Sequence, residues 1–148
     1  MADARIDAAL AIVAVPLDRR LVWEALQAAG AVNDFIHGRL LPEGNKFLAG
    51  VGDRVLSLVI TETARQDGVT IGETNIRLQN LAKNERLATL CDSTGLTRLV
   101  KLSNAAVYAG AGVGTRTKSA TIEAVIGAAY LHAGIDCAVQ VMRNLTVI

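Results

Sequence analysis

Apolar residues recur with the period of an α-helix through two long segments of this chain, and these segments limit what it can fold into. In the segment from about 46 to 66, the apolar positions follow the spacing i, i+4, i+7 and i+8, which is typical of one buried helix face. They are Val51, Val55, Leu58 and Val59. In the segment from about 119 to 133, the residues on one face are Ile122, Val125, Ile126, Ala129 and Tyr130. Each helix must bury this face against another element, so we expect the two to pack together.

The composition favours helices throughout, in a single domain over residues 1–148. Hydrophobic residues make up 51% of the chain but aromatic residues only 3%, so the core must be aliphatic. This balance indicates an all-α fold, because a β-sandwich would use more Thr, Tyr and Phe. We expect about six to eight helices and no sheet.

Shorter helices are expected around the two long ones. They cover about 6–14, 18–29 with Asp18 as N-cap, 73–92 with a break near Asn84, and 136–144 with Asp136 as N-cap, and a helical turn is expected at 99–102. Residues 31–44 are expected to form an irregular connection. Residues 104–118, rich in Gly and Ala, are expected to form a mobile loop.

Charge and cysteine content restrict the class of protein. The net charge is +1, so any RNA-binding surface must be a local patch rather than the whole molecule. Cys91 and Cys137 have neither metal-site nor disulfide spacing, which indicates an intracellular, cytoplasmic protein and leaves a mitochondrial location open. Acidic residues precede the first apolar run, so no secretory signal is expected, and no run is long enough to span a membrane.

Three blocks of sequence together indicate a family. The first is Asn45-Lys46-Phe47-Leu48-Ala49-Gly50-Val51-Gly52-Asp53, the second is Asn84-Glu85-Arg86-Leu87-Ala88, and the third runs from Ser119 through Glu123-Ala124-Val125-Ile126-Gly127-Ala128 to Leu131, followed by Gly134. In this order they resemble the nuclease domain of ribonuclease III, over about residues 17–145. The resemblance implies a ribonuclease III endonuclease-domain-like helical bundle.

The second block also imitates the start of the family signature, with Asp92 at the matching offset. Spacing decides between the two candidates. Asp53 and Glu123 are 70 positions apart, close to the family's separation of its two acids, whereas Asp92 and Glu123 are only 31 apart. Residues 45–53 are therefore taken as the signature, and Glu85 is interpreted as a solvated helix residue.

The resemblance implies a site of four carboxylates that holds a divalent ion, Mg²⁺ or Mn²⁺, for hydrolysis of a phosphodiester. Position by position, the four fall on Ala49, Asp53, Ala120 and Glu123. Asp53 and Glu123 are thus the candidate catalytic and metal-binding residues, and the alanines have no ligand atom. A further family acid falls on Lys46, which reverses the charge. Lys46 could instead form an ion pair with Asp53 or Glu123, in which case the two acids would have a structural role.

Two further features concern partners. Arg116 and Lys118 flank the Gly-rich stretch and are candidate contacts to a phosphate backbone. In the family, an aromatic residue of the signature inserts into the partner subunit, and the matching position here is Gly50. A homodimer would therefore use the face around Phe47, Gly50 and Arg54. The separate domain that binds double-stranded RNA in many relatives is not expected.

Two functions follow as alternatives. The first is a pseudoenzyme with a degenerate metal site, which binds double-stranded or structured RNA, or a protein, with little or no nuclease activity. The second is an active, divalent-metal-dependent endonuclease for double-stranded RNA that uses a reduced carboxylate set. The departures at Lys46, Ala49 and Ala120 favour the first, and the sequence leaves open whether the protein is an enzyme.

Overall fold

The computed structural model describes residues 2–31, 35–36 and 38–148, and it is all-α apart from one small hairpin. In the described part of the chain, eight α-helices follow one another: α1 (Ala2–Val13), α2 (Arg19–Ala25), α3 (Lys46–Gln66), α4 (Ile71–Ala82), α5 (Asn84–Thr94), α6 (Asn104–Tyr108), α7 (Thr115–Ala133) and α8 (Ile135–Asn144). A 3-10 turn spans Thr97–Leu99. The predicted fold class is confirmed.

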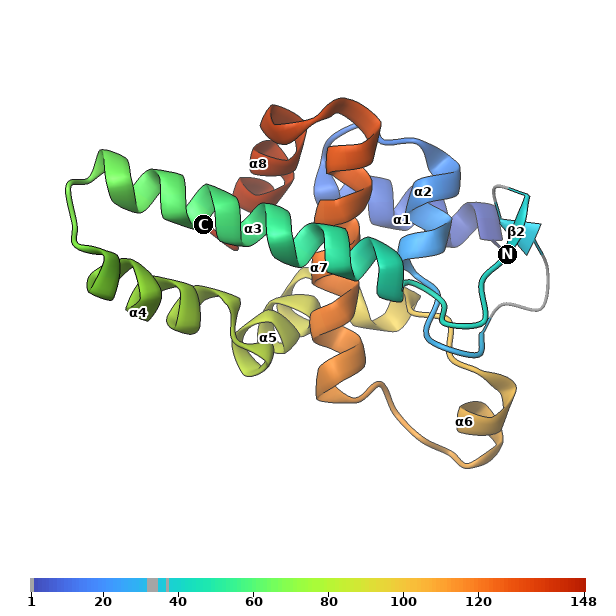
Figure 1. Cartoon of the computed structure of the whole chain (residues 1–148). Helices are drawn as coiled ribbons and strands as arrows, with labels where there is room; N and C mark the ends of the chain where they lie inside the picture. Colours follow the sequence, from blue (N-terminus) through green and yellow to red (C-terminus); the bar gives the residue numbers. More distant parts are fainter. Residues whose placement is uncertain (1, 32–34, 37) are drawn as a thin grey trace.

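Helices α3 and α7 cross at the centre of the molecule, and their contact is the most extensive between any two described helices. Figure 1 shows α7 passing across α3, with α5 beside the lower half of α7 and α8 returning along its upper end. The predicted packing of the two long helices is confirmed. The core beneath them is aliphatic, as the composition requires, and its large, fully buried members include Leu26, Leu48, Leu56, Leu87, Ile122 and Ile126.

Two glycines allow this crossing to be very close. A Cβ built on Gly52 would lie 1.7 Å from the backbone carbonyl oxygen of Glu123, and one built on Gly127 would lie 2.2 Å from that of Leu48. Any side chain at either position would therefore collide with the backbone of the other helix. The glycines bring the backbones of α3 and α7 into direct contact, and they fix which residues face each other across the crossing.

Local signals explain several helix ends. The Asp18 carboxylate accepts hydrogen bonds from the backbone N–H groups of Arg20 and Leu21, so the predicted cap of α2 is confirmed. Thr70 and Glu73 form a capping box at the start of α4. The predicted break near Asn84 falls at Lys83, and Asn84 is the first residue of α5. Asp136 also lies inside the first turn of α8, whose N-cap is Gly134.

The structure corrects the extent of two segments that were expected to be irregular. Residues 104–118 are not a loop throughout, because α6 covers Asn104–Tyr108 with a Ser103 cap, and α7 begins at Thr115. Residues 31–44 contain an antiparallel pair, β1 (Phe35–Ile36) and β2 (Arg39–Leu40), so the expectation of no sheet was wrong in this detail. Gly38, with φ of 73°, provides the left-handed backbone of the turn between them.

The apolar stripes were also partly misplaced. Leu58 is 54% exposed and Tyr130 is 40% exposed, although both were assigned to buried faces. The buried face of α3 is wider and includes small residues, because α3 lies so close to α7: it comprises Leu48, Ala49, Gly52, Val55, Leu56, Val59, Ile60 and Ala64. No helix in the described ranges is long and apolar enough to cross a membrane.

Candidate functional site

The α3–α7 crossing brings Asp53 and Glu123 together. Asp53 follows Gly52 directly on α3, and Gly52 touches the backbone carbonyl of Glu123 on α7. Their carboxyl groups interact: burial, with a smaller contribution from the charge of Asp53, raises the pKa of Glu123 to about 7, against the lowering effect of a hydrogen bond from Ser119. Glu123 thus holds a proton near neutral pH, because burial and the neighbouring Asp53 carboxylate both disfavour its charged form.

The site includes two polar residues, Ser119 and Asn84, that were not among the predicted site residues. The buried Ser119 hydroxyl lies 2.9 Å from Asn84 Oδ1 and 3.3 Å from Glu123 Oε1, so it can donate to either oxygen. Asn84 is the first residue of α5 and also the first residue of the second sequence block. Its place in that block is the sequence signal that could have assigned it to the site. All three blocks therefore meet here, with Ser119 connecting Asn84 to Glu123.

The two alanines remove oxygen atoms from the site. Ala49 is buried on α3, and Ala120 is half-buried on α7, one position after Ser119. Within the described ranges, no cluster of three or more His, Cys, Asp or Glu side chains could hold a metal ion. Two carboxylates, of which Glu123 has a pKa raised to about 7, are a poor fit to a tightly bound divalent ion, which takes six or more oxygen ligands.

Lys46 does not neutralise the acidic pair. It is exposed at the start of α3, and no ion pair joins it to Asp53 or Glu123. The interpretation in which Lys46 balances the two acids therefore has no support in the structure. Instead, Lys46 faces a cavity of about 280 Å³ between the starts of α3 and α7, whose lining residues are Ala28, Ala29, Asn45, Lys46, Arg116, Thr117 and Ala120.

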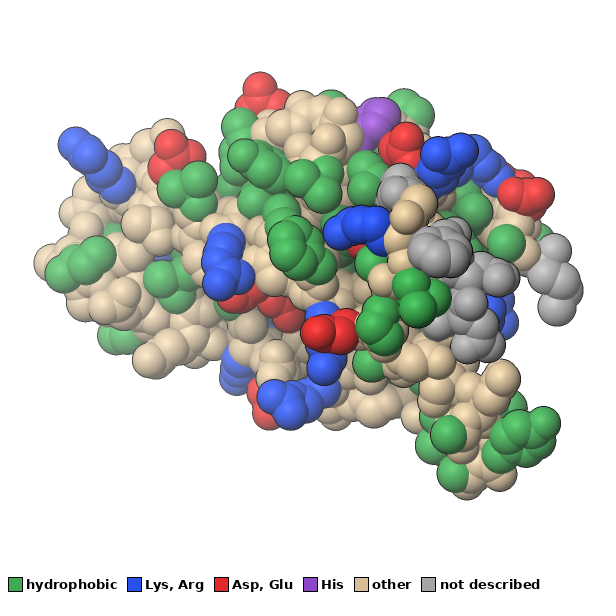
Figure 2. Space-filling model, turned by 45° about the vertical axis from the view of Figure 1, so that its right-hand side comes forward, with side chains coloured by type: hydrophobic (Ala, Val, Ile, Leu, Met, Phe, Trp, Pro, Cys, Tyr) green, Lys and Arg blue, Asp and Glu red, His purple; other side chains and the backbone are tan. Residues whose placement is uncertain are grey.

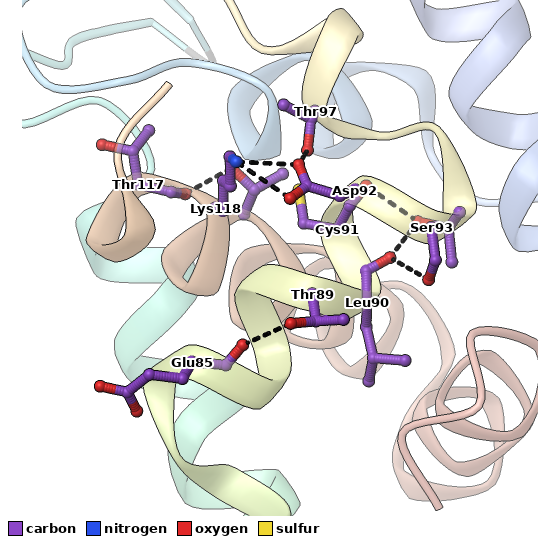
Figure 3. Close-up of polar contacts among 11 residues, drawn as sticks. Glu85, Thr89, Leu90, Cys91, Asp92, Ser93, Thr97, Thr117 and Lys118 are labelled. Atoms are coloured by element: carbon purple, nitrogen blue, oxygen red, sulfur yellow. Dashed lines mark hydrogen bonds and ion pairs between the residues drawn. The ribbon is translucent and has the colours of Figure 1, made fainter. Parts of the chain in front are cut away.

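Arg116 and Lys118 lie on the first turns of α7 and not in a loop, and the structure separates their roles. The ammonium nitrogen of Lys118 lies 2.9 Å and 3.0 Å from the two carboxylate oxygens of Asp92. Thr97 donates to the same carboxylate at 2.7 Å, and these contacts lower the pKa of Asp92 (Figure 3). Lys118 therefore ties α7 to α5, whereas Arg116 is exposed beside the cavity.

The segment of α5 that resembles the start of the family signature, from Asn84 to Asp92, contributes no carboxylate to the site. The side chain of Glu85 points away from its helix into solvent in Figure 3, and only its backbone carbonyl is used, by the Thr89 hydroxyl at 2.9 Å. Asp92 is held by Lys118 and Thr97. The spacing argument therefore selected the segment whose acid faces Glu123.

The face expected to form a dimer, around Phe47, Gly50 and Arg54, is exposed at Phe47. Position 50 is a glycine, so it carries no aromatic side chain that could insert into a partner subunit. Phe47 is 71% exposed on the outer side of α3. Arg54 folds back so that its guanidinium donates to the Gly50 carbonyl at 3.0 Å, which partly covers the glycine. Figure 2 shows that the charged side chains on the visible face are scattered, with both signs side by side and hydrophobic groups between them.

Comparisons with known proteins agree on one family. A model of ribonuclease-III-like domains matches residues 20–147. Ribonuclease 3 of Cereibacter sphaeroides is 32% identical over 103 residues, which cover 68% of this chain and 45% of that protein, and ribonuclease 3 of Thermobifida fusca is 32% identical over 68% of this chain and 43% of that protein. The chain thus spans less than half the length of these curated relatives.

Solved structures show the same fold. A nuclease domain of ribonuclease III from Campylobacter jejuni superposes with a TM-score of 0.80 at 22% identity, covering 95% of each chain. A second structure of that domain gives a TM-score of 0.76 at 21% identity, covering 94% of this chain and 92% of the other.

Proposed function

The chain belongs to the ribonuclease-III-like family, and on that premise we propose that its domain binds double-stranded or structured RNA with little or no metal-dependent cleavage. One observation carries the proposal: at the α3–α7 crossing, Asp53 and Glu123 lie together while Ala49 and Ala120 contribute no oxygen atoms, and Lys46 and Arg116 line a cavity that Ala120 also lines. An RNA ligand also implies an intracellular location.

The residues of this site are expected to bind a divalent ion only weakly. If an ion were bound, Asp53 and Glu123 would hold it, and it would supply charge neutralisation and an activated water. Binding the ion requires Glu123 to give up a proton it holds up to a pH of about 7. The ammonium of Lys46, at the position where the family carries an acid, repels a cation instead of attracting it.

RNA binding is supported by the exposed cations that remain free in the same region. Arg116 lies on the first turn of α7 and Lys46 on the first turn of α3, and both line one cavity next to the lost acid position 120. Cations near a phosphate backbone provide affinity that does not depend on base sequence. Because the net charge is only +1, such local pairs must carry the electrostatic attraction.

The direct test is binding of long double-stranded RNA in the presence of EDTA, followed over a range of salt concentrations. We expect binding that persists without divalent ions and weakens steeply with added salt, because counterions are released from the RNA. Absence of any RNA binding, together with capture of a defined protein ligand, would favour the protein-binding alternative and refute this proposal.

A second candidate is an active endonuclease with a reduced carboxylate set. The close approach of Asp53 and Glu123 favours it, because Mg²⁺ can keep several waters and use one or two carboxylates together with a substrate phosphate. Cleavage of double-stranded RNA with Mg²⁺ or Mn²⁺, abolished by Asp53→Asn, would establish this function in place of the first.

We also propose that the domain forms a homodimer through the exposed face around Phe47, Gly50 and Arg54. Phe47, one turn before Gly50, is the aromatic side chain available to replace the missing inserted residue. A dimer of this kind would present two RNA-binding sites to one duplex.

A further inference from the structure

We infer that the cavity between the starts of α3 and α7 is a phosphate-binding site in which Lys46 and Arg116 hold the phosphate directly, with no metal ion between. The identity of the ligand, a backbone phosphodiester of RNA, rests on the proposed function. The chemistry of the site rests on the cavity itself, whose volume is about 280 Å³. In this site, side-chain cations take over the task that a bound metal performs in a carboxylate site.

The charges around the cavity are of one sign. Its lining contains one lysine and one arginine, and the other lining residues in the described part of the chain are uncharged. Asp53 and Glu123 are not among the lining residues. The cavity therefore presents two positive charges and no negative one, which suits an anion and opposes a cation.

Both cations are available to a ligand. Among the residues that the structure describes, neither Lys46 nor Arg116 takes part in an ion pair, whereas Lys118, two positions further along α7, is bound to Asp92. The guanidinium of an arginine matches two phosphate oxygens at once, and a lysine ammonium adds a point charge. Arg116 is therefore the phosphate contact on α7, and Lys118 is a structural residue.

The frame of the cavity is rigid, so the two cations are brought to the same place before a ligand arrives. Lys46 and Arg116 lie on the first turns of helices of 21 and 19 residues, which are in close contact at the glycine crossing. The buried Asn45 side chain donates to the Ala25 carbonyl at 2.8 Å and anchors the start of α3. Thr117 also lines the cavity. The positive ends of both helix dipoles add a smaller attraction for an anion.

The small side chain of Ala120 is part of the site. It lines the same cavity, at the position where the resemblance implies a carboxylate. A carboxylate there would cancel one of the two positive charges and exclude a phosphate unless a metal ion were bound. The loss of the acid at 120 and the gain of the lysine at 46 thus act in the same direction, from a site for a cation to a site for an anion.

The experiment measures affinity for a short RNA duplex by fluorescence anisotropy in EDTA, across a series of salt concentrations. We expect Lys46→Ala and Arg116→Ala each to weaken binding about tenfold, and to lower the slope of log affinity against log salt by about one. The control is Arg65→Ala, which removes an exposed cation from the last turn of α3 and is expected to change affinity less than about twofold. Ala120→Asp should weaken binding as well, and the neutral Ala120→Asn should not.

A second probe separates the site from the proposed function. Titration with inorganic phosphate, followed by backbone amide chemical shifts, should perturb residues 28–29, 45–46 and 116–120 in the wild type and not in the Lys46→Ala/Arg116→Ala double variant. Phosphate binding at these residues without any RNA binding would refute the proposed function and retain the anion site. RNA binding that is equal in all variants, or that is lost in EDTA, would overturn the inference while leaving RNA recognition in place.

Discussion

The backbone carbonyl oxygen of Glu123 occupies the place where a side chain on Gly52 would be, 1.7 Å from the Cβ of an alanine built there. The atom in the way belongs to the backbone of a buried helix, so it cannot rotate aside. Helices α3 and α7 must separate to accept any residue at position 52, and the residues of the candidate site move with them.

Gly52→Ala should therefore lower the free energy of unfolding by about 3 kcal/mol or more, at the upper end of overpacking effects. Gly50→Ala is the matched control, because a Cβ there meets only the flexible end of Arg54 at 3.5 Å. It should raise stability by about 0.5–1 kcal/mol, since alanine is the better helix former. Urea unfolding of the two variants measures the difference, and equal stabilities would show that the helices are not in the close contact described.

A pH-dependent stability is expected from Glu123, whose pKa lies at about 7 in the folded protein against an ordinary value of 4.5. Between these values the folded state binds more protons than the unfolded state, so stability falls as the pH rises. The contribution is fully present below pH 4.5 and is lost as the pH rises through about 7. Allowing for solvent screening, the loss is about 1–2 kcal/mol.

Glu123→Gln removes this titration. The difference in unfolding free energy between wild type and variant, measured from pH 4.5 to pH 8, should therefore change in favour of the variant as the pH rises. A difference that stays constant over this range would mean that Glu123 titrates at its ordinary value and that Asp53 does not crowd it.

The features that follow from sequence pattern were predicted correctly. Those that depend on how closely, and at what angle, the helices pack against each other were not. The two long helices, the cap at Asp18 and the Asp53–Glu123 pairing follow from periodicity, capping chemistry and block spacing. The exposure of Leu58 and Tyr130 could not be read in this way, because the angle of the α3–α7 crossing decides which flank of each helix is covered. The contact of Ser119 with Asn84 joins residues 35 positions apart on separate helices.

The distinction between Arg116 and Lys118 also required the structure. Both look like solvated cations in sequence, beside a Gly-rich stretch. Only the placement of Asp92 at the end of α5, with Thr97 in the 3-10 turn that follows, shows that Lys118 is already bound. The start of α7 at Thr115 was missed because Thr and Arg residues after glycines carry little helical pattern of their own.

Self-association should depend on Phe47. Truncating it with Phe47→Ser removes an aromatic side chain from each subunit of a symmetric dimer, at about 1.5 kcal/mol or more per side, so the dimer should weaken about 100-fold. Ile76→Ser, at an apolar position of α4 that is 57% exposed, is the control and should have little effect. Sedimentation velocity measures both, and a wild type that remains monomeric at about tens of micromolar would end the dimer proposal.

Metal affinity should be recoverable by restoring the lost charges. The triple variant Lys46→Glu, Ala49→Glu and Ala120→Asp should bind Mn²⁺ more tightly than the wild type, as measured by calorimetry on samples checked for folding by circular dichroism. Each single change adds like-charge repulsion to an empty site, so the triple variant should gain more than the sum of the singles. Additive or absent gains would show that these positions do not share one site.

The central claim is that this domain binds double-stranded RNA without cutting it, and a single-turnover assay tests that claim most directly. Protein in excess is incubated with end-labelled long double-stranded RNA and Mn²⁺, and each sample is run on a native and on a denaturing gel. We predict RNA that is retarded on the native gel and intact on the denaturing gel, with the same result for Asp53→Asn. Discrete cleavage products from the wild type that disappear in Asp53→Asn would contradict the account and identify Asp53 and Glu123 as a working catalytic site.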